Sequence, residues 1–296
     1  MPERMAYTVT FWGSRGSIPT PGAHTARYGG NTPCVAVEGP GGQLVILDAG
    51  TGIRGLGLQL VQHQNGAVKA EILLSHTHWD HIQGLPYFKP FFAPGNRVRI
   101  WGSAQGKASL ESILHLQMDP AVFPVPLSAI SAELKVQQVE PDGAEFVVGP
   151  FRVRAMQLRH PGTTLAYRLT PKDGGASMAY VTDNELGSGG SYDMPPSWRA
   201  DLIKFLNGVD LLIHDGMYTP EELAQHRGWG HSSYEEAVEL AADAGAKRLV
   251  LFHHEPEHDD RALDDLVAAA QRVARRRGAK APTEVTAARE GMQLSL

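Results

Sequence analysis

The segment Ser75-His76-Thr77-His78-Trp79-Asp80-His81 carries more chemical information than any other part of this chain. It places three histidines and one aspartate directly after the apolar run Glu71–Leu74. Alternate side chains of an extended chain share a face, so His76, His78 and Asp80 can point the same way, and a turn at Asp80 would bring His81 back toward them. Nitrogen and oxygen donors of this kind suit zinc, iron or manganese. The segment therefore predicts a metal site at the end of a buried strand.

The composition is that of an ordinary globular protein. The 296 residues are 42% hydrophobic and 20% charged, which is enough material for a large core. The net charge of −5 argues against a general nucleic-acid-binding surface. The single cysteine, Cys34, excludes an intramolecular disulfide and a cysteine-rich metal site.

The sequence also bears on where the protein acts. Its first residues are too few and too alternating for a signal peptide. No apolar run approaches the roughly 20 residues of a membrane span. We therefore expect a soluble, cytoplasmic protein without a membrane partner. The oligomeric state stays open, with a homodimer as the commonest soluble assembly.

Hydrophobic periodicity predicts the order of strands and helices. Strands are expected at Tyr7–Trp12, Cys34–Glu38, Gln43–Asp48, Glu71–Ser75, Val98–Trp101, Leu134–Val139, Phe151–Leu158, Thr164–Thr170, Met178–Thr182, Val209–Ile213, Arg248–Phe252, Glu284–Ala287 and Met292–Leu296. Helices are expected at Ile53–His63, His81–Phe88, Ala108–Met118, Leu202–Leu206, Ser232–Asp243 and Asp259–Arg277, with a surface loop over Asn184–Pro196. In each half the strands come first and the helices later. Two packed sheets with helices on both outer faces would satisfy this pattern. No linker divides the chain, so we expect one domain over residues 1–296.

Other histidines and aspartates directly follow predicted strands. They are Asp48, His160, Asp183, the pair His214-Asp215 and the pair His253-His254. Any one of them alone is usually a turn or capping residue. Strand ends converge when strands share a sheet edge, however, and loops there carry function. The joint pattern predicts one polar cluster assembled from distant parts of the chain.

Over nearly the whole chain, this order of motifs resembles the metallo-β-lactamase-fold metallohydrolases. The resemblance implies an α/β fold, an αββα sandwich of two mixed sheets, with two divalent metal ions at one edge. It implies that one ion is held by His76, His78 and His160, and the other by Asp80, His81 and His253, with Asp183 between them. Zinc is the first expected metal, and manganese or iron also fits such donors.

Two further residues bear on this implied metal site. Asp48 resembles the family's aspartate that orients a ligand histidine through its other ring nitrogen. His254 remains an alternative to His253, although the family ligand directly follows the apolar strand, which favours His253.

Three further motifs resemble the phosphodiesterase branch of this superfamily, which includes ribonuclease Z and small cyclic-phosphate phosphodiesterases. They are Leu212-Ile213-His214-Asp215, Gly230-His231-Ser232-Ser233 and Arg248–His253. In that branch a histidine in the place of His231 assists the transition state, supported by an acidic residue in the place of Asp215. Ribonuclease Z usually has glutamate there, so Asp215 is a departure. The chain also shows no long Gly- and Lys-rich arm and is acidic, which disfavours tRNA as a partner.

The expected activity is hydrolysis of a small cyclic or linear phosphodiester by a metal-bridging hydroxide. In this hypothesis Asp80 holds its metal and accepts a proton from the attacking water. His231 stabilises charge or protonates the leaving oxygen, and Asp215 raises its basicity. The plainer alternative is that His231 only caps the helix expected at Ser232.

Two other functions stay open. The same site could hydrolyse a lactone or a thioester, although a carbonyl reaction needs no second acid–histidine pair such as Asp215 and His231. The chain could instead be a non-catalytic sensor that binds a nucleotide through its metals. The natural substrate, the metal, and the role of the Gly-rich loop Gly13–Ser17 are not decided by the sequence. That loop and the segment Arg27–Thr32 resemble a bacterial subgroup of cyclic-nucleotide-phosphodiesterase-like proteins.

Overall fold

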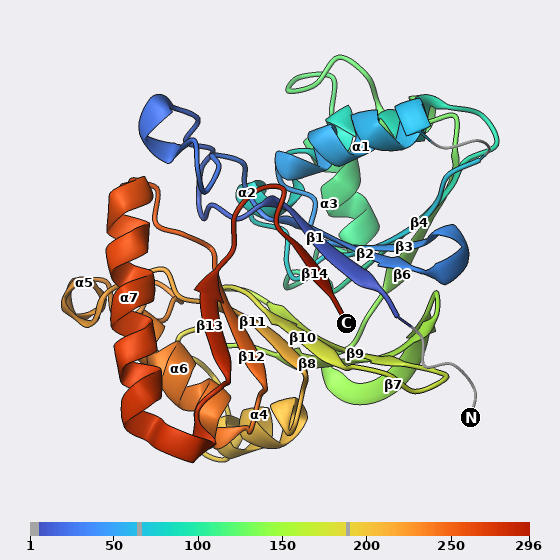
Figure 1. Ribbon diagram of the computed structural model, residues 1–296. Helices are drawn as coiled ribbons and strands as arrows, with labels where there is room; N and C mark the ends of the chain where they lie inside the picture. Colours follow the sequence, from blue (N-terminus) through green and yellow to red (C-terminus); the bar gives the residue numbers. More distant parts are fainter. Residues whose placement is uncertain (1–5, 64–66, 188–189) are drawn as a thin grey trace.

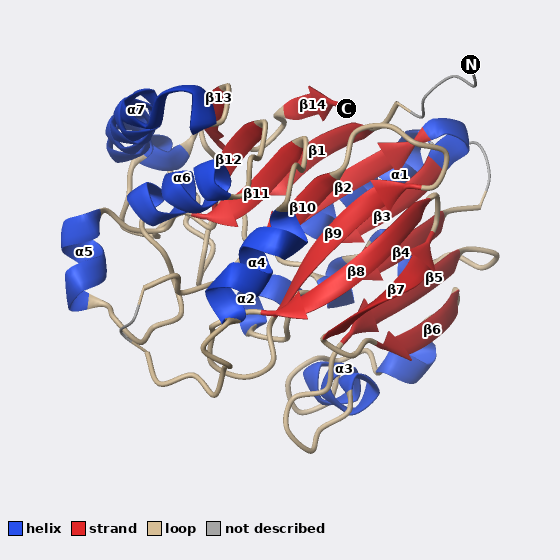
Figure 2. Ribbon diagram, turned by 90° about the horizontal axis from the view of Figure 1, so that it is seen from below, coloured by secondary structure: helices blue, strands red, loops and turns tan. Residues whose placement is uncertain are grey.

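Two β-sheets packed face to face form the centre of the molecule. The computed structural model describes residues 6–63, 67–187 and 190–296, and within these ranges each sheet has seven strands. Helices cover the outer face of each sheet (Figures 1 and 2). This arrangement confirms the αββα fold class expected from the sequence. The expectation about a signal peptide, and the part of the predicted 184–196 loop at residues 188–189, lie outside the described residues.

The first sheet combines strands of the amino-terminal half with the last strand of the chain. Its strand order is β14-β1-β2-β3-β4-β5-β6. The bounds are β1 Thr8–Gly13, β2 Cys34–Gly39, β3 Gln43–Leu47, β4 Lys69–Leu73, β5 Arg97–Gly102, β6 Glu133–Gln138 and β14 Gln293–Ser295. Strands β3 to β6 are parallel. Parallel strands need long crossovers, and α1 (Gly52–His63) and α3 (Leu110–Gln117) lie in two of them, covering the outer face.

The second sheet contains the strands of the carboxy-terminal half. Its strand order is β13-β12-β11-β10-β9-β8-β7. The bounds are β7 Asp142–Val148, β8 Phe151–Gln157, β9 Leu165–Pro171, β10 Met178–Val181, β11 Leu211–Asp215, β12 Arg248–Phe252 and β13 Glu284–Ala287. Three helices cover its outer face, α4 Trp198–Leu206, α6 Tyr234–Asp243 and α7 Asp260–Arg277. Helix α6 begins at a capping box of Ser233 and Glu236.

The core between the sheets is built from both halves of the chain. Phe11 and Leu47 of the first sheet pack there with Phe151, Tyr180 and Phe252 of the second, and all five are buried. Burial of this apolar surface fixes how the sheets face each other, and therefore which strand ends meet. Among the described residues, no helix is both long and apolar enough to cross a membrane.

Three elements differ from the sequence expectation. Strand β7 was not expected, because Asp142-Gly143 is typical of a turn and the strand lies at a sheet edge with mostly exposed side chains. Helix α5, Pro220–Gln225, was not expected because it is short. It nevertheless carries a sequence signal, a capping box between Thr219 and Glu222 with proline at the first position. The expected helix at His81–Phe88 is instead the short helix α2, Trp79–Ile82, followed by a 3-10 turn.

Candidate metal centre

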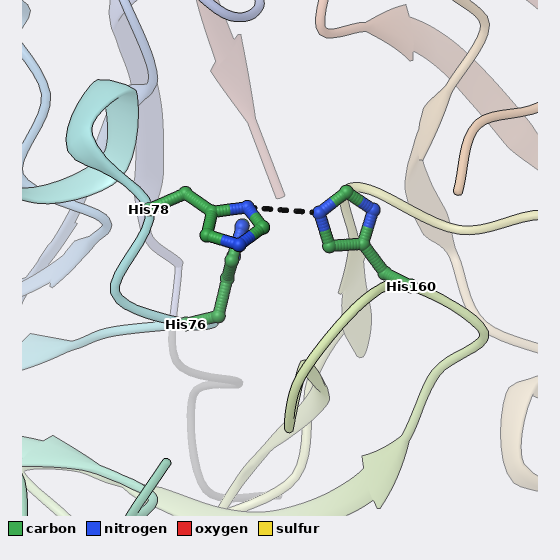
Figure 3. A group of neighbouring side chains, drawn as sticks. All are labelled: His76, His78 and His160. Carbon is green, nitrogen blue, oxygen red and sulfur yellow. Dashed lines mark hydrogen bonds between the residues drawn. The ribbon is translucent and has the colours of Figure 1, made fainter. Parts of the chain in front are cut away.

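Three histidines form the first of two groups of potential metal ligands. His76 and His78 follow β4, and His160 follows β8. Figure 3 shows the three rings turned toward one another, with the Nδ1 of His78 3.0 Å from the Nε2 of His160. The Nε2 of His76 is buried and has no hydrogen-bond partner among the described residues. A buried polar atom without a partner is costly, so this group fits a bound cation.

The second group contains two carboxylates and two histidines. Asp80 and His81 come from α2, Asp183 follows β10 and His253 follows β12, and all four are buried. The Nε2 of His253 is 3.1 Å from the Oδ2 of Asp80 and 3.3 Å from the Oδ1 of Asp183. Mixed nitrogen and oxygen donors at such spacing suit zinc, manganese or iron.

The carboxylate of Asp183 lies between the two groups. Its Oδ1 is 3.2 Å from the Nε2 of His81. Its Oδ2 faces the first group, 3.7 Å from the Nε2 of both His76 and His160. A carboxylate placed in this way can contact two cations, one through each oxygen.

The charge states of Asp183, His160 and His76 suit cations as well. Burial alone would raise the pKa of Asp183, but the surrounding imidazoles, His253 first, hold it well below its usual range. Burial lowers the pKa of His160 to about 4 and that of His76 well below its usual range. Deprotonated carboxylates and neutral imidazoles are the forms that bind metal.

Asp48 fixes the orientation of His81. Its Oδ2 is 2.7 Å from the Nδ1 of His81 and accepts a hydrogen bond from the hydroxyl of Tyr180 at 2.8 Å. Its Oδ1 accepts from the backbone N–H of Ser75 at 2.7 Å. This buried network turns the Nε2 of His81 toward the cluster, as carboxylates behind metal-binding histidines do.

Asp48→Asn should weaken metal binding about 10- to 100-fold while leaving the fold intact. The amide keeps the shape of the side chain but loses the charge that orients His81. Metal affinity measured by competition with a chelator tests this. Asp210→Asn is the matched control, because Asp210 also accepts from a serine N–H, that of Ser177, but lies away from the cluster. Equal affinities of the two variants would contradict the role of Asp48.

An imidazole–carboxylate pair lies beside both groups. The Nδ1 of His231 is 2.8 Å from the Oδ2 of Asp215, the last residue of β11. Burial would lower the pKa of His231, but the charge and hydrogen bond of Asp215, together with the charges of Asp183 and Asp80, outweigh burial and raise the pKa to about 9. The ring of His231 stacks on that of His253, with centroids 5.0 Å apart. The structure thus brings His231 and Asp215 to the edge of the cluster.

Two histidines near strand ends do not join the cluster. His214 turns away, with its Nδ1 2.6 Å from the backbone carbonyl of Asp215. His254 also turns away, with its Nε2 2.8 Å from the carbonyl of Ala288. Of the two candidates left open by the sequence, His253 is the one that faces the other donors.

Glu185 is a buried residue of the site that the sequence did not indicate. It falls in the expected surface loop 184–196, and that expectation is wrong for Asn184 and Glu185, which are 0% and 1% exposed. The Oε2 of Glu185 accepts from the backbone N–H groups of Gly228 and Gly230 at 2.9 and 3.1 Å. It thereby fixes the loop whose Gly230 carbonyl lies 3.0 Å from the Nδ1 of His160. The sequence feature that could have indicated Glu185 is its position as an acidic residue two positions after Asp183.

Strained backbone conformations are concentrated in and around the cluster of potential metal ligands. Among the described residues, the non-glycine positions with left-handed φ are Ser17 at 61°, Asp48 at 59°, Asp183 at 38° and His253 at 60°. Each costs of order 1–3 kcal/mol and persists only where the surroundings impose it. All four lie in or against the cluster, which is where strain is expected when geometry serves function.

A two-sheet sandwich with histidines and aspartates gathered at its strand ends defines a metal-dependent hydrolase fold. Residues 43–254 match the family model described as beta-lactamase superfamily domain. The chain belongs to this superfamily and is a hydrolase of the metallo-β-lactamase fold. The fold implies divalent metal ions, and the donor set described above fits them.

Individual relatives agree with this assignment. The chain is 23% identical to ribonuclease Z of Haloferax volcanii over 288 residues, which covers 84% of each protein. It superposes on YhfI, a metallo-beta-lactamase fold protein of Bacillus subtilis, with a TM-score of 0.69 at 21% identity, covering 99% of this chain and 100% of that one. It also superposes on a diphosphatase from the PhnP family with a TM-score of 0.67 at 18% identity, covering 99% and 98%. At such identities the solved structures establish the fold.

Proposed function

We propose that residues 1–296 form one domain, a metal-dependent phosphodiesterase that acts on a small cyclic or linear phosphodiester. The observation that carries the proposal is the position of the His231–Asp215 pair directly beside two groups of potential metal ligands, with Asp183 between them. The names of the relatives support it, since a ribonuclease and a diphosphatase both cleave phosphorus–oxygen bonds.

In this proposal the two groups of side chains hold two divalent ions. The proposed ligands are His76, His78 and His160 for one ion, Asp80, His81 and His253 for the other, and Asp183 for both. Zinc is the first candidate. When bound, such ions acidify water and offset the negative charge of the phosphodiester.

The protein groups would move the protons. A water oxygen forms the new bond to phosphorus, and the carboxylate of Asp80 accepts the proton that this water releases. The bond from phosphorus to the leaving oxygen breaks, and His231 donates a proton to that oxygen. Asp215 occupies the Nδ1 of His231, so the Nε2 is the nitrogen that can face the substrate.

A substrate panel tests the class of reaction. We expect the purified, metal-loaded protein to hydrolyse bis(p-nitrophenyl) phosphate and cyclic nucleotides with a higher kcat/KM than any lactone or thioester. A thioester releases a thiolate that needs no proton from His231, and a lactone carries no negative charge for the His231–Asp215 pair and the metal ions to offset. Faster turnover of a lactone would contradict the proposal, and tight cyclic-nucleotide binding without turnover would favour a sensor.

The size of the substrate is a separate question, because several relatives are named as ribonuclease Z. The net charge of −5 favours a small substrate over a long polyanion. A 3′-extended tRNA belongs in the same panel. Cleavage of that RNA alone would keep the phosphodiesterase class and overturn the small substrate.

A further inference from the structure

We infer that Arg15 is a positioning residue that anchors the loop Gly13–Ser17 so that this loop holds Asp80 and His253 in place as ligands. The inference rests on the proposed metal centre. It assigns a role to a Gly-rich segment that neither the fold nor the relatives explain. Four observations carry it.

The side chain of Arg15 is shielded from solvent and forms no ion pair within the described residues. It is 0% exposed, and no carboxylate within the described ranges forms a salt bridge with it. Its Nε donates to the carbonyl of Gly29 at 2.9 Å, and its Nη1 donates to the carbonyls of Glu255 and His258 at 3.0 and 2.6 Å. Burying a cation without a direct ion pair is costly, so the contacts between the segments that Arg15 joins must offset that cost.

The loop and the segment after β12 form one unit. The N–H of Gly16 donates to the carbonyl of His254 at 2.9 Å, and the N–H of His254 donates to the carbonyl of Ser14 at 2.9 Å. The side chain of Arg15 extends this pairing to Glu255 and His258, just beyond. The position of the loop and the position of the His253 turn are therefore coupled.

The loop touches both residues that it is inferred to position. The backbone N–H of Ser17 donates to the Oδ2 of Asp80 at 2.8 Å. This is the same oxygen that lies 3.1 Å from the Nε2 of His253. Gly16 packs on the His253 ring so closely that a Cβ there would lie 2.4 Å from its Nδ1. Any side chain at position 16 would force the His253 ring or the loop to shift.

The hydrogen bonds of the loop reach only one of the two groups of potential metal ligands, so loss of the loop's position should affect the two groups differently. Within the described chain, the loop makes no hydrogen bond to His76, His78 or His160. Ser17 and His253 both have left-handed φ, 61° and 60°. Such conformations persist only where neighbouring contacts impose them, and the Arg15 hydrogen bonds supply such contacts. Loss of the anchor should loosen the second group and spare the first.

Arg15→Lys tests the anchor, because lysine keeps the charge but lacks the planar fork that reaches three carbonyls. We expect one of two bound ions to lose affinity about 10- to 100-fold while the other is unchanged. The readouts are the metal-to-protein ratio after dialysis against graded chelator and the visible spectrum of the cobalt-loaded protein. Arg168→Lys is the matched control, since Arg168 also donates to two carbonyls, of Phe205 and Asn207, but away from the site.

Gly16→Ala is the second variant, and it leaves Arg15 intact. It should cause the same selective loss, whereas Gly39→Ala, where a Cβ would meet its nearest atom at 3.2 Å away from the cluster, should bind both ions. If the wild type binds two ions and both test variants keep both, or lose both in parallel, Arg15 and Gly16 have no positioning role and the inference is wrong. A wild type that binds fewer than two ions contradicts the proposed metal centre itself.

Discussion

Asp183→Ala should lower phosphodiester hydrolysis on the order of 1000-fold or more, and it should reduce the bound metal below two ions per chain. Asp183 faces both ligand groups, one through each carboxylate oxygen. Its loss removes a donor and a negative charge from both at once, and metal ions at such a site contribute several kcal/mol to stabilising the transition state. Metal content and kcat on the same sample measure the effect.

Variants of single-group ligands provide the comparison. His78→Ala and Asp80→Ala each remove a donor from one group only, so each should lose metal and activity together while the fold is largely retained. Asp201→Ala, which removes an exposed partner of Lys204 on α4, should change neither quantity. Full metal content and full activity in Asp183→Ala would show that the carboxylate between the groups binds nothing.

His231→Ala should lower kcat about 100- to 10,000-fold for a diester with a poor leaving group. The loss should be much smaller for an activated nitrophenyl diester, because nitrophenolate departs without a proton. The dependence of kcat on leaving-group pKa in the wild type and in the variant measures this difference.

Asp215→Asn and His24→Gln are the comparison variants for that result. Asp215→Asn should show the same leaving-group dependence in weaker form, because the pair is held by the contact between the Asp215 Oδ2 and the His231 Nδ1. His24→Gln replaces an exposed histidine outside the described ligand groups and should have no effect. An equal loss on both classes of leaving group would argue against proton donation by His231.

The sequence predicts the fold and much of the cluster because the relevant signals are local. The apolar strand before His76, and the single polar residues that follow other strands, can be recognised within ten residues of chain. Parallel strands then bring these ends to one edge, as β10, β11 and β12 do. The geometry places the proposed donors together, while their roles as ligands stay a prediction.

The parts that the sequence did not reveal depend on contacts between distant segments. Arg15 reaches His258, and Glu185 reaches Gly228 and Gly230, through backbone groups that leave no residue-specific pattern. The choice between His253 and His254 depends on the left-handed turn at His253, which periodicity cannot predict. Strand β7 is paired on one side only, so little of it is buried and its apolar pattern is weak.

Anomalous diffraction at the zinc absorption edge, from crystals grown with zinc, tests the metal centre most directly. We expect two peaks in one pocket, one contacted by His76, His78 and His160 and the other by Asp80, His81 and His253, with an Asp183 oxygen on each. Zinc bound elsewhere on the molecule, or no zinc at these side chains, would contradict the account.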